Sequence, residues 1–353
     1  MTDLSFYQNK KVLITGHTGF KGSWLTKILL DAGADAAGYA LEPPTDPNLF
    51  TIAGLDKRLG DRSVIGDIRD FQKLFKLFQD FQPEIVLHLA AQPIVKRSYE
   101  DPQGTYETNV MGTVNLLECV RKTPSVKSVL NVTTDKVYEN FEWQRAYKEE
   151  DRLDGYDPYS NSKSCSELVT HSYKRSFLDE AGIAVSTARA GNVIGGGDFA
   201  YARILPDCVR AAEKGESVIL RNPDSTRPYQ HVLEPLFVYL MIAEAQYKEF
   251  RYAGYYNVGP DDRDCLTTGH IADLFCQYWG NGMQWENHSD GGPHEANFLK
   301  LDNTKIKETF GWKPVWDVEE AVKRCVEFAK AEDKVKCMEE EIRAFLEGLN
   351  ADV

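Results

Sequence analysis

The sequence lacks several features that would place it in a broad class of proteins. No apolar run approaches the roughly 20 residues of a membrane-spanning helix, and the polar stretch 1–11 has no apolar signal-peptide core. Positive charge is in deficit, because 41 lysines and arginines face 54 aspartates and glutamates, and a net charge of −13 argues against a nucleic-acid partner. The seven cysteines form no C-x-x-C pair and none stands at metal-ligand spacing to a histidine, so we expect no metal site. These absences favour a cytoplasmic protein in a reducing compartment.

The chain has 353 residues and shows no repeat or low-complexity linker, and its first half alternates between two kinds of segment. Strands are expected at 12–15, 36–40, 63–66, 85–90, 126–133 and 185–190, and helices at 23–32, 71–81, 105–122 and 160–178. The strands are continuous apolar runs, which is typical of a parallel sheet covered on both faces. The sequence therefore predicts an α/β fold with a Rossmann-type doubly wound parallel sheet.

This alternation ends near Gly191, where a loop rich in glycine follows at 195–198. Helices are expected at 205–214, 234–247, 267–279, 303–310 and 318–330, a strand at 217–220, and a partly exposed terminal helix after 331. We interpret residues 1–190 as a dinucleotide-binding Rossmann domain. Residues 191–353 are interpreted mainly as a smaller C-terminal α/β substrate-binding lobe, with some segments returning to the first domain.

A glycine-rich turn, Thr15-Gly-His-Thr-Gly-Phe-Lys-Gly22, lies between the first strand and the first helix. Its three glycines allow a tight turn and a close approach of pyrophosphate to the backbone, and the following helix N-terminus favours an anion. A tight turn without a ligand is the alternative, but the strand–turn–helix context favours a dinucleotide. No acid or arginine ends the strand at Ala40, so the phosphate state of the cofactor stays open. Asp67, followed by Ile68, closes the third strand and is a candidate contact for adenine.

Tyr159 and Lys163 are four residues apart and therefore share one face of the expected helix. A nearby ammonium favours the phenolate, so we expect a tyrosine pKa lowered toward working pH and able to take a proton from a substrate hydroxyl. A Y-x-x-x-K spacing is common and mostly structural by itself. Its weight here comes from its position behind a glycine turn and after the polar strand end 133–136.

Together these motifs resemble the extended short-chain dehydrogenase/reductase family, whose members act on nucleotide-activated sugars. The matching positions are Gly16-x-x-Gly19-x-x-Gly22, His88-Leu-Ala-Ala91, Asn109-Val-x-Gly112-Thr113, Thr134, Tyr159 and Lys163. Within the family, the likeness is closer to the 4,6-dehydratases of CDP-activated glucose. It is carried by segments 15–22, 66–70, 90–93, 134–136, 155–160, 190–198, 221–223, 227–232 and 293–295, which span nearly the whole chain. One departure is Val137, where that pattern has cysteine.

The resemblance implies NAD as cofactor and CDP-D-glucose as substrate. It implies a catalytic group of Thr134, Asp135, Lys136, Tyr159 and Lys163. The cofactor contacts that it implies are Gly16, Thr18, Gly19, Phe20, Gly22, Asp67, Ile68, Leu89, Ala90, Ala91 and Asn109, with Tyr159 and Lys163. Arg227 is the best candidate for the substrate diphosphate, with Asn192 and Asn257 as amide partners, Arg203 and Arg221 as secondary cations and Gln92 nearby. The histidines 17, 88, 231 and 294 are interpreted as structural.

The pair Asp135-Lys136 distinguishes reaction types within the family. A dehydratase must oxidise C4 of the hexose, remove the C5 proton and expel the C6 hydroxyl, after which hydride returns to C6 and net redox is zero. Our hypothesis is that a protonated Asp135 donates to the departing oxygen and a neutral Lys136 takes the C5 proton. A surface ion pair at a strand end is the other interpretation of these two residues.

Three alternatives stay open from the sequence. A nucleotide-sugar 4-epimerase would share every cofactor residue, although Asp135-Lys136 argues against it. A dTDP- or GDP-sugar 4,6-dehydratase differs only in the base. A non-catalytic dinucleotide-sensing protein would be free to lose Thr134, Tyr159 or Lys163. The resemblance also implies a homodimer or homotetramer that pairs the helices 105–122 and 160–178, although Val110, Val114 and Leu117 fit an intrachain core equally well.

Overall fold

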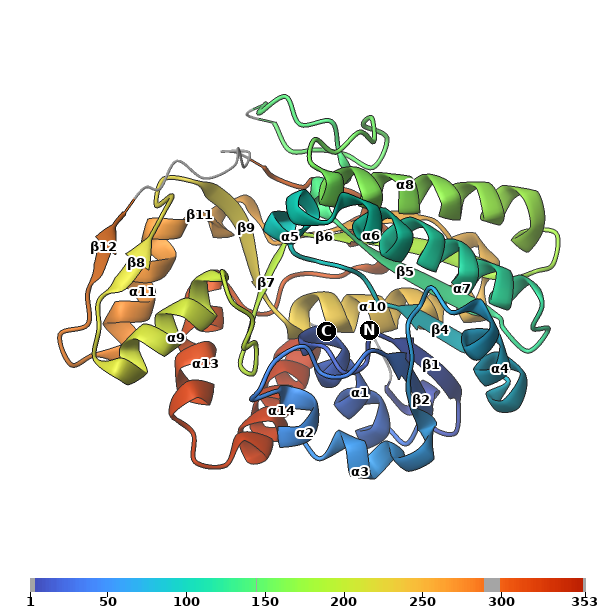
Figure 1. Cartoon of the computed structure of the whole chain (residues 1–353), viewed down its shortest axis with the longest axis horizontal. Coiled ribbons are helices and arrows are strands. Elements are labelled where there is room, and N and C mark those ends of the chain that lie inside the picture. Colours follow the sequence, from blue (N-terminus) through green and yellow to red (C-terminus); the bar gives the residue numbers. More distant parts are fainter. Residues whose placement is uncertain (1–3, 144, 289–298, 352–353) are drawn as a thin grey trace.

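A parallel sheet of seven strands forms the larger part of the molecule (Figure 1). The computed structural model describes residues 4–143, 145–288 and 299–351. The strand order is β10-β6-β5-β4-β1-β2-β3, with bounds β1 Lys11–Thr15, β2 Asp35–Ala40, β3 Ser63–Ile65, β4 Ile85–His88, β5 Ser128–Thr134, β6 Ala184–Ala190 and β10 Tyr255–Val258. The order reverses between β1 and β4, and ligands bind in the crevice at such a switch point, beyond the carboxyl ends of the strands. This confirms the predicted doubly wound fold.

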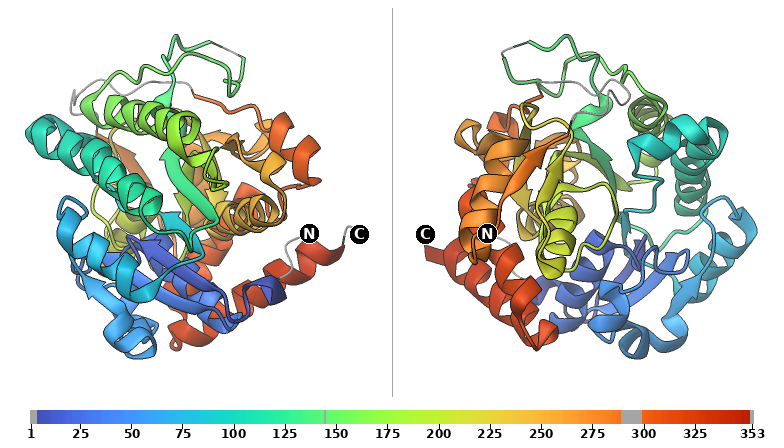
Figure 2. Two further views of the ribbon diagram at one scale, coloured as in Figure 1. Left: turned by 90° about the vertical axis from the view of Figure 1, so that its right-hand side faces the viewer. Right: turned by 60° about the vertical axis from the view of Figure 1, so that its left-hand side comes forward.

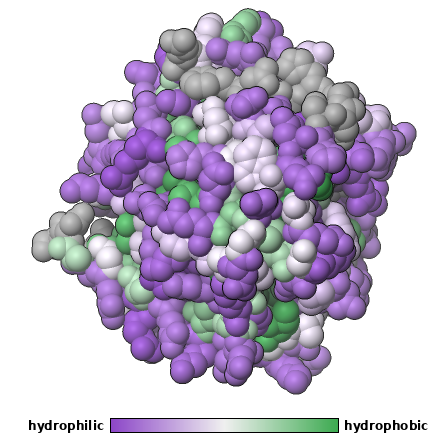
Figure 3. All heavy atoms as spheres, turned by 90° about the vertical axis from the view of Figure 1, so that its left-hand side faces the viewer, coloured by the Kyte–Doolittle hydropathy of each residue, from purple (hydrophilic) through white to green (hydrophobic). Residues whose placement is uncertain are grey.

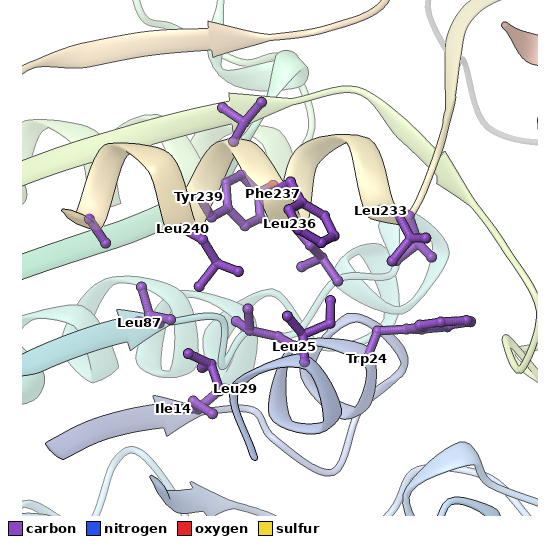
Figure 4. Close-up of a cluster of buried hydrophobic side chains, with 14 of the residues drawn as sticks. Ile14, Trp24, Leu25, Leu29, Leu87, Leu233, Leu236, Phe237, Tyr239 and Leu240 are labelled. Atoms are coloured by element: carbon purple, nitrogen blue, oxygen red, sulfur yellow. The ribbon is translucent and has the colours of Figure 1, made fainter. Parts of the chain in front are cut away.

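The two faces of the sheet are covered by different helices, because successive side chains of a strand point to opposite faces. Leu13 of β1 packs in a core with α4 (Phe71–Phe81) and α7 (Gly112–Arg121). Its neighbour Ile14 packs on the other face with α1 (Phe20–Asp31) and α10 (Leu233–Lys248). Figure 4 shows Ile14 and Leu87 of the strands facing Leu25 of α1 and Leu240 of α10. This packing fixes the helix that follows the glycine turn against the sheet.

Two long helices run side by side along one side of the sheet (Figures 1 and 2). The first is built from α6 (Pro102–Tyr106), a π-helical segment η3 (Glu107–Met111) and α7. It begins three residues before the expected start at 105, because Asp101 accepts a hydrogen bond from the N–H of Gly104 and caps the first turn. The second is α8 (Pro158–Tyr173), which continues in the π-helical segment η5 (Lys174–Leu178).

A smaller unit is built from two short sheets and three helices (Figure 2). The sheets are β11-β9-β7 (Cys265–Thr267, Thr226–His231 and Asn192–Ile194) and β12-β8 (Trp285–Asn287 and Val218–Leu220), and the helices are α9 (Ile204–Lys214), α11 (Thr268–Trp279) and α13 (Val318–Lys330). Its outer face is mainly hydrophilic, with apolar side chains in small separate areas (Figure 3).

Several segments after residue 190 lie on the larger unit. β10 pairs with β6 as the edge strand, and α10 packs on β5 and β6. α12 (Thr304–Phe310) contacts β10, and α14 (Lys334–Ala351) places Phe345 in the core beside Phe237. The strands β7, β9, β10, β11 and β12 and the short helices α2 (Leu49–Ile52), α3 (Leu55–Leu59) and α5 (Val95–Glu100) were not predicted from the sequence. Among the described residues, no helix is long and apolar enough to cross a bilayer.

Candidate active site

The glycine turn holds the backbone closer than side chains would allow. Gly16 has a φ of +77°, and a Cβ built on it would lie 2.8 Å from the backbone nitrogen of Ala90. A Cβ on Gly22 would lie 2.0 Å from the carbonyl oxygen of Gly16. Gly19 caps α1 without any side-chain hydrogen bond, so the first N–H groups of the helix remain for an anion. This cradle fits the pyrophosphate of a dinucleotide such as NAD.

The neighbours of the turn hold it in place. Thr18 donates its hydroxyl to the carbonyl of Leu41 at 2.8 Å, and the N–H of Ala90 donates to the hydroxyl of Thr15 at 3.2 Å. Phe20, Leu89, Ala90 and Ala91 are partly buried around it. The turn and the loop after β4 therefore form one ordered surface at the switch point.

Asp67 forms an ion pair with Arg69 just after β3. Its oxygens accept hydrogen bonds from the guanidinium of Arg69 at 2.7 to 3.1 Å, and this holds the pKa of Asp67 below its usual range. The side chain of Ile68 is buried in the core against Gly112. The structure places the Asp67 carboxylate in an ion pair with Arg69, and its contact with adenine stays a prediction.

Asn109 and Gln92 clamp the loop after β4. The side-chain oxygen of Asn109 accepts from the N–H of Gln92 at 2.8 Å, and its amide donates to the carbonyl of Gln92 at 3.1 Å and to Ser162 at 2.9 Å. The amide of Gln92 is itself bonded to the backbone of Ile94 and to Thr105. These bonds hold the loop after β4, and the assignments of Asn109 to the cofactor and of Gln92 to the substrate stay predictions.

The expected catalytic residues come together at the end of β5. Asp135 is fully buried in a 3₁₀ turn (η4, Asp135–Val137), and its Oδ1 accepts from the hydroxyl of Thr134 at 2.9 Å and lies 3.6 Å from the Nζ of Lys136. Its Oδ2 has no partner among the described residues. On α8, Lys163 is buried and donates to the carbonyl of Val132 at 2.9 Å. The cluster therefore has one unpaired carboxylate oxygen beside a set of cations.

The pKa of Tyr159 is raised, opposite to the sequence-based expectation. Burial is the main cause, and the ammonium of Lys136 and the interaction with the Thr134 side chain oppose it only in part. Lys163 is not among the main influences on this pKa: its ammonium donates to the Val132 carbonyl, and burial lowers its own pKa to about 8. Lys136 and, to a smaller extent, Arg203 are the main cations that favour the phenolate.

Lys21 is a charged residue of the site that the sequence analysis passed over. Burial lowers its pKa to about 7, and the nearby cations Lys163 and Arg203 act in the same direction while Asp135 opposes them. Its ammonium lies 5.9 Å from the ring centre of Tyr239 on α10. The sequence feature that could have identified Lys21 as a site residue is its position between Gly19 and Gly22 of the turn.

Two of the expected substrate residues lie near Lys136 or Tyr159, and two others lie on β9 or between β8 and β9. Asn192 accepts from the Nζ of Lys136 at 3.5 Å, and Arg203 pairs with Asp198 at 3.0 Å while influencing the pKa of Tyr159. Arg227 is buried on β9 and donates to the carbonyl of Thr226, whereas Arg221 is exposed between β8 and β9.

Asn257 is fully buried, and protein groups occupy its whole side chain. It accepts from Tyr138 at 2.6 Å and donates to the carbonyls of Tyr147 and Asp302. Its expected substrate role stays a prediction, and the contacts observed for it are all within the chain. The motif 293–295, which contains His294, lies outside the described residues.

The described histidines that were interpreted as structural are buried. His17 bonds to Ser63 and burial lowers its pKa to about 4, and His88 lies between Thr15 and Thr113 with a pKa that burial lowers to about 3. His231 packs against Trp24 and Trp316. Among the described residues, no group of three or more histidine, cysteine or acidic side chains is arranged to hold a metal ion.

Known proteins are similar to this chain over most of its length. A family model described as GDP-mannose 4,6 dehydratase matches residues 13–325. The chain is 47% identical over 356 residues to CDP-glucose 4,6-dehydratase of Salmonella typhimurium, covering 98% of this chain and 99% of that protein. It is 27% identical over 344 residues to dTDP-glucose 4,6-dehydratase of Xanthomonas campestris, covering 90% and 92%.

Two solved structures have the same fold. The dTDP-glucose 4,6-dehydratase of Bacillus anthracis in complex with NAD has a TM-score of 0.75 at 22% identity, covering 93% of this chain and 99% of that one. The UDP-glucose 4-epimerase of Thermus thermophilus in complex with NAD has a TM-score of 0.77 at 24% identity, covering 91% and 99%. Because one fold hosts both reaction types, the reaction has to be argued from the site.

Proposed function

The chain belongs to the GDP-mannose 4,6-dehydratase family of extended short-chain dehydrogenases/reductases, and from this membership we propose that it converts CDP-D-glucose to CDP-4-dehydro-6-deoxy-D-glucose with NAD as cofactor. The product differs from the substrate by one water, lost from C5 and C6. The identity of 47% to a CDP-glucose 4,6-dehydratase supports the choice of base and sugar, and the glycine cradle supports the dinucleotide.

The observation that carries this proposal is the state of Asp135. One of its oxygens is held by Thr134 and Lys136, and the other is buried without a partner in the described structure. A buried carboxyl oxygen without a partner costs free energy unless a ligand or a proton satisfies it. Such an oxygen suits an acid that hands a proton to a departing hydroxyl. A reaction that only exchanges hydride at C4 has no use for it.

The remaining roles follow from the positions of the side chains. Bound NAD supplies the acceptor for the C4 hydride and the source of the hydride that C6 receives. Tyr159 takes the proton of the C4 hydroxyl, and the ammonium of Lys136 favours its phenolate form. The elimination uses the other charge state of Lys136, in which its proton has passed to Asp135, whose Oδ1 lies 3.6 Å from the Nζ. The neutral Lys136 then takes the C5 proton, and the protonated Asp135 donates its proton to the C6 oxygen, which leaves as water. Lys163 donates to the carbonyl of Val132 on β5.

Cations on the smaller unit are proposed to bind the substrate diphosphate. The candidates are Arg227 on β9 and Arg203 at the N-cap of α9, together with Asn192 on β7, which contacts Lys136. Guanidinium groups bind phosphate oxygens in bidentate geometry. Arg221 is kept as a secondary contact at the exposed end of this path.

The decisive experiment is mass spectrometry of purified protein incubated separately with CDP-glucose and dTDP-glucose in the presence of NAD. Loss of one water from CDP-glucose alone is the expected result. Loss from dTDP-glucose alone, or from a GDP-sugar, would keep the reaction and overturn the base. No mass change with any of them would favour the 4-epimerase, which leaves mass untouched, and proton NMR would then find a C4-inverted sugar.

We also propose a homodimer or homotetramer in the cytoplasm. Three large apolar side chains on the paired helices are exposed: Met111 at 51%, Leu168 at 52% and Phe177 at 47%. Leu117, by contrast, is buried within the chain, and Val110 and Val114 are partly buried. All seven cysteines are free thiols, which supports a reducing compartment.

A further inference from the structure

Glu167 and Arg189 form a fully buried ion pair directly beneath the catalytic strand end. Glu167 lies on α8 and Arg189 on β6, and the Nη2 of the arginine lies 3.0 Å from the Oε2 of the glutamate. Both side chains are at most 1% exposed. Replacing such a pair by apolar groups is often neutral or stabilising, so stability alone is a weak reason for it.

The carboxylate of Glu167 is bonded on all sides. Its Oε1 accepts from the hydroxyl of Thr133, and its Oε2 accepts from Thr187 at 2.8 Å and contacts His171 at 3.2 Å as well as Arg189. These partners belong to three elements, β5, β6 and α8. One buried charge therefore fixes how these elements sit relative to one another.

The contacts repeat along a single face of α8. Tyr159, Lys163 and Glu167 are four residues apart, so they point in the same direction. Tyr159 is hydrogen-bonded with Thr134, Lys163 donates to the carbonyl of Val132, and Glu167 accepts from Thr133. A shift of α8 along β5 would break all three contacts together.

Arg189 connects the ion pair to the residues that follow β5. Its Nη1 donates to the hydroxyl of Tyr138 at 2.8 Å and to the carbonyl of Glu149 at 3.0 Å, and Tyr138 donates to Asn257 at 2.6 Å. Tyr138 stands two residues after Lys136. The ion pair thus reaches both the helix that bears Tyr159 and the turn that bears Asp135 and Lys136.

We propose that Glu167 and Arg189 are positioning residues of the dehydration site, which hold α8, and with it Tyr159 and Lys163, in register with the catalytic end of β5. This inference rests on the proposed function, since it assigns its effect to Tyr159 and Lys163. Neither residue touches the reacting atoms; each acts through Thr133, Lys163 or Tyr138.

The charges around Lys163 agree with this role. Burial lowers the pKa of Lys163 to about 8, and Glu167 raises it. Lys21 on α1 is a second cation near Lys163, while His88 on β4 is neutral because burial lowers its pKa to about 3. Tyr159 on the same helix and Asp135 after β5 are further titratable groups of this cluster. Burial opposes the ionisation of Glu167 itself, but Arg189, His171 and Thr133 hold its pKa well below its usual range.

The test compares pH profiles of kcat for water loss in four variants. In Glu167→Gln, the alkaline limb is expected to move to lower pH by about one unit, which corresponds to a loss of roughly tenfold at pH 8.5. Glu167→Asp keeps the charge and is expected to return most of the shift. The double variant Glu167→Gln/Arg189→Met removes the guanidinium together with its carboxylate partner, so no buried arginine is left without its counter-ion. It is expected to fold and to show the same shift of the alkaline limb.

Glu341→Gln serves as the matched control, because Glu341 is a buried carboxylate on α14 that pairs with His231 at 3.4 Å. It is expected to lower the thermal midpoint without moving the pH profile. A folded double variant whose alkaline limb coincides with wild type would overturn the inference. An inactive wild type would instead refute the proposed function, so the two failures are distinguishable.

Discussion

At the scale of single residues, Asp135 separates dehydration from simple oxidation and reduction at C4. Asp135→Asn preserves the volume and the acceptor for the Thr134 hydroxyl but cannot donate a carboxyl proton. We expect water loss to slow by roughly 10²- to 10⁴-fold, the usual contribution of a general acid. Asp135 also raises the pKa of Tyr159, so its neutral replacement does not hinder proton removal at C4. The measurement is the rate of loss of one water by mass spectrometry.

Asp80→Asn is a suitable control for this variant, because Asp80 lies exposed on α4 in an ion pair with Lys76. It is expected to leave the rate unchanged. An Asp135→Asn protein that eliminates water at the wild-type rate would remove Asp135 from the mechanism.

The burial of the Lys163 ammonium lowers the stability of the folded protein at neutral pH. Its pKa in the folded protein is about 8 against 10.5 in the reference state, so the unfolded chain binds more protons between pH 8 and 10.5. The contribution of this lysine to stability therefore rises with pH through that window and is unfavourable below pH 8. Lys163→Met is expected to be inactive yet more stable than wild type at pH 7, by roughly 1–3 kcal/mol.

Thermal unfolding at a series of pH values measures this effect. The advantage of Lys163→Met over wild type is expected to shrink as the pH rises from 8 to 10.5. A variant that is less stable than wild type at pH 7 and at pH 10 alike would contradict the argument, since the loss of the bond to Val132 would then outweigh the burial of the charge.

At the scale of elements, the glycine turn is the feature with the least tolerance for change. A Cβ on Gly22 would lie 2.0 Å from the carbonyl oxygen of Gly16, and backbone on both sides has to shift to relieve it. Gly22→Ala is expected to lower stability by about 1–3 kcal/mol and to weaken NAD binding measured by titration calorimetry. Gly254→Ala is the control, because its nearest atom would be at 3.5 Å. Unchanged NAD affinity in Gly22→Ala would argue against the turn as the pyrophosphate site.

Elements with a strong periodic pattern could be predicted from the sequence, and short polar ones could not. The bounds expected for α4 and α13 coincide with those observed, because both helices carry an apolar face and an aspartate cap. β9 reads Thr-Arg-Pro-Tyr-Gln-His and has no apolar alternation, so it is a strand only through its pairing with β7 and β11. Tertiary pairing decides such segments, and it is invisible in a local window.

The same distinction applies to the candidate site. The turn at 15–22 and the pair Tyr159 and Lys163 have fixed local spacing, and the structure brings them to one crevice with Thr134 and Asp135. The ion pair of Glu167 and Arg189 joins residues 22 positions apart on different elements, and no local sequence pattern predicts it. Asn257 was assigned by resemblance, whereas the structure places it in a buried network with Tyr138 and Tyr147.

At the scale of the whole molecule, the crevice is assembled by two units. The reversal of strand order between β1 and β4 opens the switch point, and β5 and α8 deliver the acid/base residues to it. Arg203 and Arg227, the proposed diphosphate contacts, lie on the smaller unit at the N-cap of α9 and on β9. Because β10 and α10 return to the large sheet after β9, the two units are linked by several chain crossings. The division at residue 190 stays a prediction.

The paired helices on one side of the sheet give the whole-molecule prediction. Leu168 is 52% exposed on α8, next to the helix that presents Met111, and burying such side chains between two copies would remove apolar surface from water. Wild type is expected to sediment at twice, or four times, the 39.9 kDa of one chain. Leu168→Glu places a charge in that interface and is expected to give monomers, or dimers if the wild type is a tetramer. Phe250→Glu, at an exposed position on η6 (Phe250–Tyr252), is the control and is expected to keep the wild-type mass. A monomeric wild type, or a Leu168→Glu protein that keeps the wild-type mass, would exclude these helices as the interface.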